Sequence, residues 1–263
     1  MASSLLQKAV ARARESEPIQ AGKALVGPLG LNQIAYTETR VDPIDPAVCA
    51  ERRLVANLEG TEHAQAFSTL AIQLLLKMRS HGFRSLAIVA PTAGTGASLV
   101  AANVAVAMAR EPNHSVLLVD ADLRVPGLNN YFGINVEYGL LDHLSSNVPL
   151  SEILVNPGVP KLVMLPGRGG FEGAAELLAS RRMTELIAEV RRRYDSRIVL
   201  YDMPPLLGAA DALSVLPQLD CALLVIQEGR TSKKELESAK RILQGVPMIG
   251  AVVNQGRSGF GRR

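Results

Sequence analysis

The chain has 263 residues, of which 48% are hydrophobic and 20% charged, a composition that is ordinary for a globular protein. No apolar run approaches the roughly 18 residues that a membrane span needs, and the N-terminus lacks a signal-peptide block, so we expect a cytoplasmic protein. Two cysteines make no disulfide framework, and a net charge of +3 with 4% aromatic residues and no tryptophan does not indicate a nucleic-acid partner.

The first 50 residues are predicted to lie outside the main domain. Residues 21–50 carry several glycines and prolines without a clear period, which indicates a linker. We therefore divide the chain into an N-terminal helix and linker (1–50), one main domain (51–256) and a short basic tail (257–263). The helix is predicted over 1–20, where apolar residues recur at helical spacing: Leu5, Leu6, Ala9, Val10 and Ala13.

A helical pattern runs from Glu62 to Met78, and from Ser85 onward short apolar runs alternate with helical patterns. Continuous apolar strands that alternate with helices predict an α/β fold, with a twisted parallel sheet and helices on both faces. The six apolar runs span 85–90, 115–120, 161–166, 197–202, 221–227 and 248–254, and the helical patterns between them include 98–110, 181–193 and 232–244.

A glycine-bearing turn, PTAGTGAS at 91–98, follows the first apolar run and precedes a helix. Such a turn can bind an anion, because backbone N–H groups converge there and the helix dipole favours negative charge. Gly96 and Ser98 fit the phosphate-loop pattern G-x-x-x-x-G-K-[ST], whereas Pro91 replaces the first glycine and Ala97 replaces the lysine. Taken alone this match is weak, and an ordinary strand-to-helix turn explains it equally well.

Two aspartates strengthen the phosphate-site interpretation, since Asp120 and Asp202 each end a predicted strand. Carboxylates at the C-terminal ends of parallel strands face the crevice where α/β sheets bind ligands. A hydrated Mg²⁺ prefers a few oxygen ligands from the protein beside the phosphates of its nucleotide. The sequence therefore predicts Ser98, Asp120 and Asp202 as metal ligands, and the alternative is that the aspartates only shape turns.

At these motifs the sequence resembles the bacterial tyrosine autokinases of capsule and exopolysaccharide systems, which are relatives of the ParA/MinD ATPases. VLLVDADLRVPGLNNYFG resembles the family's Walker A′ stretch, with Asp120, Asp122 and Arg124 in the D-x-D-x-R pattern. IVLYDMPPLLGAADALSVL resembles the Walker B stretch, LPGRGGFEGAAELLASRRM the segment between them, and GAVVNQ the last strand. The resemblance covers roughly residues 50–255.

The resemblance implies a P-loop NTPase-like kinase domain of ParA/MinD type that binds Mg-ATP or Mg-ADP. In an active member the catalytic residues would be Asp120, Asp122 and Asp202. Asn254 falls where the family often meets the base. The nucleotide-binding residues that the resemblance implies are Gly94, Thr95, Gly96, Ala97, Ser98, Arg124 and Asn254.

Three departures from the family pattern imply a degenerate member. Ala97 stands where the family has lysine, and loss of that charge-assisted contact costs about 1.5–3 kcal/mol, so we expect weak nucleotide binding. The family's E-x-x-R-x-x-R pattern, which helps to assemble a ring, is replaced by the neutral residues Gln65, Ser68 and Ala71. The family's C-terminal tyrosine cluster has no counterpart, because no tyrosine follows Tyr201.

These features predict a pseudokinase that regulates or scaffolds exopolysaccharide or capsule polymerisation and export. The expected partners are a membrane chain-length or co-polymerase protein, which can hold the chain at the inner face of the membrane, and a second copy or a related kinase. Two alternatives stay open. One is an active ATP-dependent tyrosine kinase that tolerates Ala97. The other is a ParA/MinD-type positioning ATPase, which is less favoured because Thr92-Ala93-Gly94 lacks the early lysine of those relatives.

Overall fold

The computed structural model of the chain describes residues 39–58, 60–192, 196–208 and 210–255. The helix predicted over 1–20, the first part of the predicted linker and the basic tail therefore lie outside the described residues. Among the helices of the described part, none is both long and apolar enough to traverse a bilayer.

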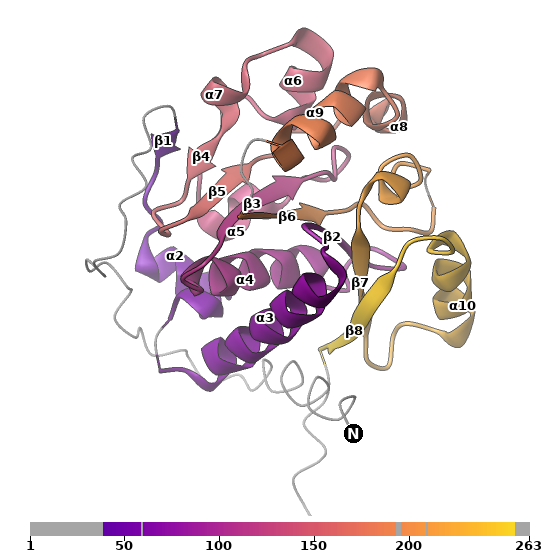
Figure 1. Cartoon of the computed structure of the whole chain (residues 1–263), viewed down its shortest axis with the longest axis horizontal. Coiled ribbons are helices and arrows are strands. Elements are labelled where there is room, and N and C mark those ends of the chain that lie inside the picture. The colour runs from indigo at the N-terminus through magenta and orange to yellow at the C-terminus, as the bar shows by residue number, and fades with distance from the viewer. Residues whose placement is uncertain (1–38, 59, 193–195, 209, 256–263) are drawn as a thin grey trace, which may run out of the picture.

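An eight-stranded sheet in the order β1-β4-β5-β3-β6-β2-β7-β8 forms the centre of the described part (Figure 1). Every neighbouring pair is parallel except β4 and β5. The predicted α/β fold is confirmed, and the six predicted strands correspond to β2, β3, β5, β6, β7 and β8. The strands are β1 (Arg40–Val41), β2 (Ser85–Val89), β3 (Ser115–Asp120), β4 (Val155–Asn156), β5 (Leu162–Leu165), β6 (Arg197–Asp202), β7 (Cys221–Gln227) and β8 (Met248–Asn254).

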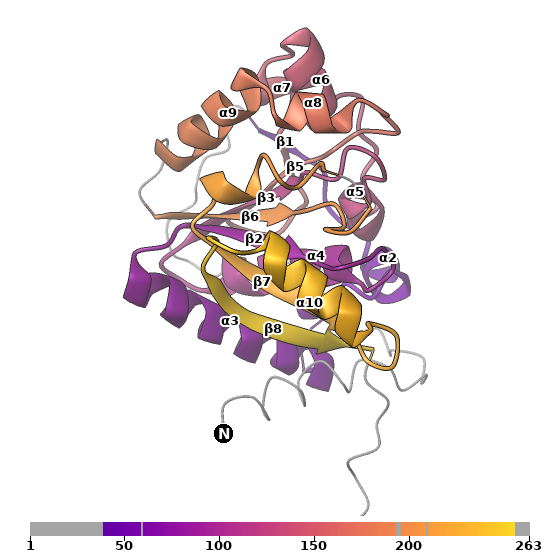
Figure 2. The ribbon, with the colours of Figure 1, turned by 90° about the vertical axis from the view of Figure 1, so that its right-hand side faces the viewer.

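Helices cover both faces of the sheet (Figures 1 and 2). Alternate residues of β2 show why: Leu86 and Ile88 pack with α2 to α5 on one face, while Ala87 and Val89 pack with α6 to α10 on the other. The helices are α2 (Pro46–Glu51), α3 (Glu62–His81), α4 (Ala97–Arg110), α5 (Leu128–Phe132), α6 (Leu140–Ser146), α7 (Leu150–Ile153), α8 (Ala174–Leu178), α9 (Arg181–Arg192) and α10 (Lys233–Ile242), with 3₁₀ turns η1 (Val55–Asn57) and η2 (Leu216–Gln218).

The end of the predicted linker is ordered. Asp45 caps α2, because its Oδ1 accepts the Ala47 amide at 2.8 Å, and Pro46 fixes the first helical turn. Cys49 in this helix is fully buried, and β1 pairs in parallel with β4. The linker prediction is therefore wrong for 40–50. A two-residue strand and a six-residue helix are too short to show a hydrophobic period in the sequence. The domain boundaries themselves stay a prediction.

Helix α3, which the predicted pattern placed over 62–78, begins after Thr61 and ends at Gly82. The Thr61 hydroxyl accepts the Ala64 amide at 3.1 Å, and Gly82 takes the left-handed conformation that closes a helix. Of the three neutral positions noted on this helix, Gln65 is exposed and Ala71 is fully buried.

Candidate functional site

The turn between β2 and α4 bends sharply into the helix N-terminus. Gly94 and Gly96 both have left-handed backbones, with φ of +78° and +86°, which favour glycine. A Cβ at Gly96 would also collide with the side-chain amide of Asn254. The first helical residue is Ala97, and its methyl packs against the apolar core on the α3 and α4 side of the sheet. The loop thus presents backbone amides and a helix N-terminus to an anion, without a side-chain cation at Ala97.

Asn254, at the end of β8, ties the loop to the sheet. Its side-chain Nδ2 donates to the Thr95 carbonyl at 2.7 Å, and its Oδ1 accepts the Gln255 amide at 2.9 Å. Both Asn254 and Thr95 are almost fully buried. The structure therefore commits the Asn254 amide to the loop backbone, while the base contact that the sequence suggests stays a prediction.

Asn254→Ala is expected to lower the free energy of unfolding by about 1–2 kcal/mol, because it leaves the buried Thr95 carbonyl without its donor. Urea unfolding followed by circular dichroism measures this loss. Asn113→Ala is the control, since Asn113 is exposed in the loop after α4. Equal urea midpoints for wild type and Asn254→Ala would contradict the assigned role.

Asp120 and Asp202 meet at the ends of neighbouring strands, where β3 and β6 pair in register. Both are buried. Asp120 accepts three backbone amides, from Asp122 at 3.2 Å and from Gly127 and Leu128 at 3.1 Å each. Burial raises the pKa of Asp120 to about 7, and the charge of Asp122 adds to the rise while the amides oppose it. Asp120 thus shapes the loop after β3 and remains beside the other carboxylate.

Asp202 is the unsatisfied member of this pair. It is 1% exposed, and neither carboxylate oxygen has a hydrogen-bond partner among the described residues. Burial and the charge of Asp120 raise its pKa well above the usual range; the nearby Ser98 hydroxyl opposes the rise without completing a hydrogen bond of ordinary geometry. A buried carboxylate in this state calls for an ion or ligand.

The donor set at this place fits Mg²⁺. Asp202 and Ser98 offer oxygens, and Mg²⁺ usually completes its shell with water and substrate phosphates. The described residues contain no cluster of three or more histidine, cysteine or acidic side chains able to hold a metal by themselves. The arrangement therefore suits a metal that arrives with a phosphate, and the ligand roles of Ser98, Asp120 and Asp202 stay predictions.

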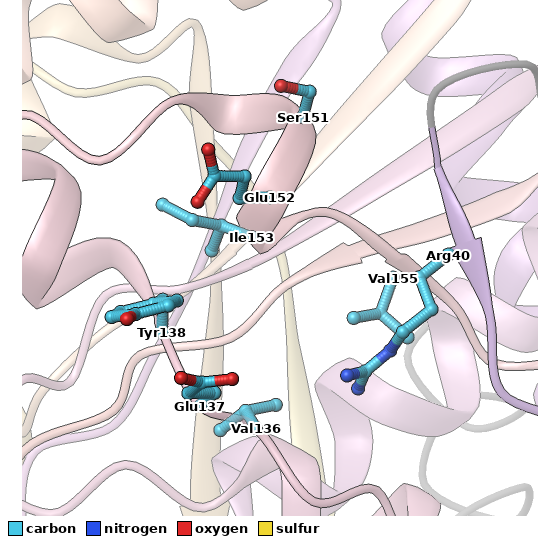
Figure 3. Close-up of a pocket in the computed structure, with 8 residues that line it drawn as sticks. All are labelled: Arg40, Val136, Glu137, Tyr138, Ser151, Glu152, Ile153 and Val155. Atoms are coloured by element: carbon cyan, nitrogen blue, oxygen red, sulfur yellow. The ribbon is translucent and has the colours of Figure 1, made fainter.

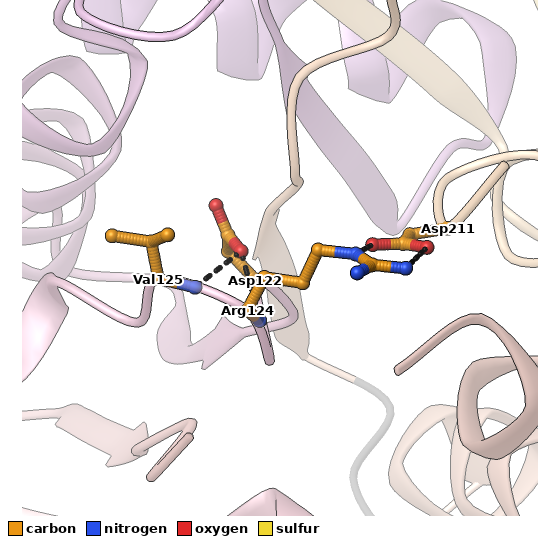
Figure 4. A network of polar contacts seen from close by, with 4 residues as sticks. All are labelled: Asp122, Arg124, Val125 and Asp211. Carbon is orange, nitrogen blue, oxygen red and sulfur yellow. Dashed lines mark hydrogen bonds and ion pairs between the residues drawn. The ribbon is translucent and has the colours of Figure 1, made fainter. Parts of the chain in front are cut away.

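The side chains of Asp122 and Arg124, the other two residues of the D-x-D-x-R pattern, bond to groups other than the Asp120 and Asp202 pair. The Oδ1 of Asp122 accepts the amides of Arg124 at 3.2 Å and Val125 at 2.9 Å. The Arg124 guanidinium forms a two-bond ion pair with Asp211, with Nη2 to Oδ1 at 3.1 Å (Figure 4). The structure thus engages Arg124 with the segment after β6, and its contact with nucleotide, like the catalytic role of Asp122, stays a prediction.

Asp211 is the partner that sequence reasoning missed. It is 1% exposed, and a buried carboxylate needs a cation or hydrogen bonds nearby. The signal was present as an acidic residue inside the apolar stretch GAADALSVL, but nothing in the sequence identifies Arg124 as its partner.

A separate pocket of about 300 Å³ lies beside the β1 and β4 edge of the sheet (Figure 3). Arg40, Glu137, Tyr138 and Glu152 are among the residues that line it, and none belongs to the turn at 91–98 or to the aspartate pair. The charge of Glu137 raises the pKa of Tyr138. This pocket has no glycine loop at a helix N-terminus, so the phosphate-site interpretation rests on the β2 and α4 turn.

Tyrosine-protein kinases of bacteria are among the known proteins that this chain is similar to. The chain is 33% identical over 206 residues to the putative tyrosine-protein kinase EpsB of Ralstonia solanacearum, covering 76% of this chain and 27% of EpsB. It is 30% identical over 207 residues to the tyrosine-protein kinase YwqD of Bacillus subtilis, covering 78% of this chain and 86% of YwqD. The chain thus spans about a quarter of EpsB and most of YwqD. No protein-family model matches it.

Solved structures agree with these relatives. The kinase domain of Escherichia coli tyrosine kinase ETK superimposes with a TM-score of 0.72 at 25% identity, covering 85% of this chain and 92% of that domain. The septum site-determining protein MinD of Pyrococcus horikoshii, solved with Mg-ADP, gives a TM-score of 0.57 at 26% identity, covering 68% of this chain and 72% of MinD. These similarities confirm the P-loop NTPase fold that the sequence predicts.

Proposed function

Because the chain belongs to the family of bacterial tyrosine-protein kinases, we propose that it is a pseudokinase that regulates or scaffolds exopolysaccharide or capsule polymerisation and export. The observation that carries the proposal is Ala97. It is the first residue of the helix at the phosphate loop, where the family has lysine, and its methyl is partly buried against the core.

The loss of that cation weighs more on chemistry than on binding. Phosphoryl transfer depends on positioning and on stabilising charge that develops on the phosphates. A missing charge-assisted contact weakens binding by about 10- to 100-fold. We therefore propose that Mg-ADP or Mg-ATP binds weakly, through the loop amides with Ser98 and Asp202, and is not turned over at a useful rate. When bound, Mg²⁺ would neutralise charge on the nucleotide phosphates.

The proposed partner is a membrane chain-length or co-polymerase protein of a polysaccharide export system. Such a partner would place the chain at the inner face of the membrane, alone or together with a related active kinase. Co-expression with the chain-length protein encoded nearest to it, followed by affinity purification, tests this placement.

A second candidate, an active kinase, is favoured by Asp202. A buried carboxylate whose two oxygens have no described partner is costly to keep, and catalysis would explain its presence. The two candidates agree on the nucleotide site and differ only in turnover.

The purified chain is expected to release no ADP and to form no phosphotyrosine when incubated with Mg²⁺ and ATP labelled on the γ-phosphate. Bacillus subtilis YwqD serves as the positive control. The chain is assayed with and without the proposed chain-length partner. Asp120→Ala and Asp202→Asn, checked for folding by circular dichroism, set the background. Turnover by the wild type that both substitutions abolish would establish the active kinase instead.

A further inference from the structure

Arg230 lies against the phosphate loop from a different part of the chain. It belongs to the turn between β7 and α10, and its Nη1 is 3.6 Å from the position that a Cβ on Gly94 would take. Apart from the immediate chain neighbours, no other heavy atom of the described residues comes within 4 Å of that position. Arg230 is exposed, so its guanidinium stands beside an otherwise open stretch of the loop.

The turn that carries Arg230 is fixed to the phosphate loop by hydrogen bonds. The Glu228 amide donates to the Asn254 carbonyl at 3.1 Å, and the Asn254 side chain donates to the Thr95 carbonyl at 2.7 Å. Within the turn, the Thr231 hydroxyl accepts the Gln227 amide at 2.9 Å. Asn254 therefore joins the two loops. Because the backbone of each loop is hydrogen-bonded to Asn254, the turn that carries Arg230 is held close to Gly94.

The surroundings of the Arg230 guanidinium decide whether it can bind a ligand. Within the described ranges no hydrogen bond or ion pair holds it, and it only lowers the pKa of Glu235 from a distance, after the stronger effect of Ser232. Arg124, the arginine that the family pattern suggests for this site, is paired with Asp211 instead. Arg230 is thus a cation at the loop whose donors are available to a ligand.

We propose that Arg230 supplies the phosphate-side positive charge that Ala97 cannot, by contacting the phosphates of a nucleoside di- or triphosphate at the loop; this rests on the proposed nucleotide site. A guanidinium offers a planar set of donors that matches phosphate oxygens and keeps its charge at every physiological pH. The cation comes from the β7 and α10 turn in place of the first turn of α4. The recognised chemistry is the polyphosphate, so affinity depends on the phosphates more than on the base.

A fluorescent ADP analogue labelled on the ribose, titrated with Mg²⁺ present, tests the assignment on the full chain. Arg230→Met is expected to raise the Kd at least tenfold, and Arg230→Lys by less, because a point charge remains. Arg241→Met is the matched control: this arginine is exposed on α10, bonded to the Ser238 hydroxyl, and its loss changes the net charge equally. Its Kd is expected to stay within about twofold of wild type.

The double variant Arg230→Met with Ala97→Lys separates a phosphate contact from a structural role. It is expected to recover at least the affinity of the wild type, since a lysine at the family position restores the cation. Thermal melting of each variant confirms that the loop is intact. Rescue by Ala97→Lys would not follow if Arg230 merely held the turn in place.

Two results would overturn the assignment and leave the proposed function standing: equal affinities for Arg230→Met and Arg241→Met, or binding by Ala97→Lys while the wild type binds nothing. Absence of binding by both the wild type and Ala97→Lys would overturn the nucleotide site itself, and the role of Arg230 with it. Tenfold weakening in Arg230→Met with rescue in the double variant supports the proposal.

Discussion

Ala97→Lys is expected to tighten the binding of Mg-ADP or Mg-ATP by about 10- to 100-fold. The new ammonium would stand at the first residue of α4, where the helix N-terminus and the loop amides already favour an anion. A charge-assisted contact of this kind contributes about 1.5–3 kcal/mol. The same lysine without nucleotide opposes the helix dipole, at a cost of about 0.3–1 kcal/mol. The gain exceeds the cost only when phosphate is bound, so the apo protein should be slightly less stable.

Titration with the fluorescent ADP analogue and calorimetry with unlabelled Mg-ADP measure this gain. Ala93→Lys is the matched control, because Ala93 is exposed in the same loop and the added charge is identical. We expect its effect to stay below about threefold, as for an exposed charge. The gain from Ala97→Lys should also be larger in the Arg230→Met background, since residues that share a ligand are not additive. An unchanged Kd for Ala97→Lys would mean that phosphates do not sit at this helix.

The sequence predicts well where long periodic elements decide the structure. The six apolar runs became strands because a parallel sheet buried on both faces leaves them no polar face. Asp120 and Asp202 were placed correctly at strand ends, but their pairing depends on β3 lying next to β6, which are not consecutive in the chain. β1 and β4, with two residues each, are too short to show any period.

The side-chain partners in the candidate site could not be read from the sequence. Arg124 turns to Asp211, 87 positions away, because a buried carboxylate needs a cation. Asn254 binds the loop backbone because β8 ends beside it, and that adjacency is a property of the fold. Arg230 has no motif of its own in the sequence, and only the fold brings the β7 and α10 turn to Gly94. The sequence motifs predict which residues lie at the candidate site. The tertiary contacts decide which of their side chains are already bonded to other residues and which are available to a ligand.

The metal-free protein is expected to lose stability as the pH rises from about 5 to 8. The pKa of Asp120 is raised from 3.8 to about 7, and that of Asp202 is also raised, mainly by burial. Between the unfolded pKa and the folded pKa, the folded state binds more protons than the unfolded state, so the free energy of unfolding falls as pH rises. Between pH 5 and 8 the loss from Asp120 alone is at most about 3 kcal/mol. His114 works in the opposite direction, because burial lowers its pKa.

Comparing the pH dependence of stability in wild type and Asp202→Asn separates the effect of the Asp120 and Asp202 pair from that of His114 and other titrating groups. Asp202 faces Asp120 across the strand pair, the Ser98 hydroxyl on α4 and, farther away, the charge of Asp122. The substitution removes the buried charge that wild type must carry above neutral pH, so Asp202→Asn should gain stability relative to wild type as pH increases. Asp42→Asn, at an exposed carboxylate, should run parallel to wild type.

Urea unfolding in EDTA at pH 5, 6, 7 and 8 measures these slopes, and a second series with Mg²⁺ and ADP reports on the ligand. A metal bound to deprotonated carboxylates should restore stability mainly at pH 7 and 8, and only in the protein that keeps Asp202. If the free energy of unfolding changes with pH equally in wild type and Asp202→Asn, the carboxylates of Asp120 and Asp202 already have hydrogen-bond partners in solution. The unpartnered oxygens of Asp202 would then give no reason to expect a ligand there.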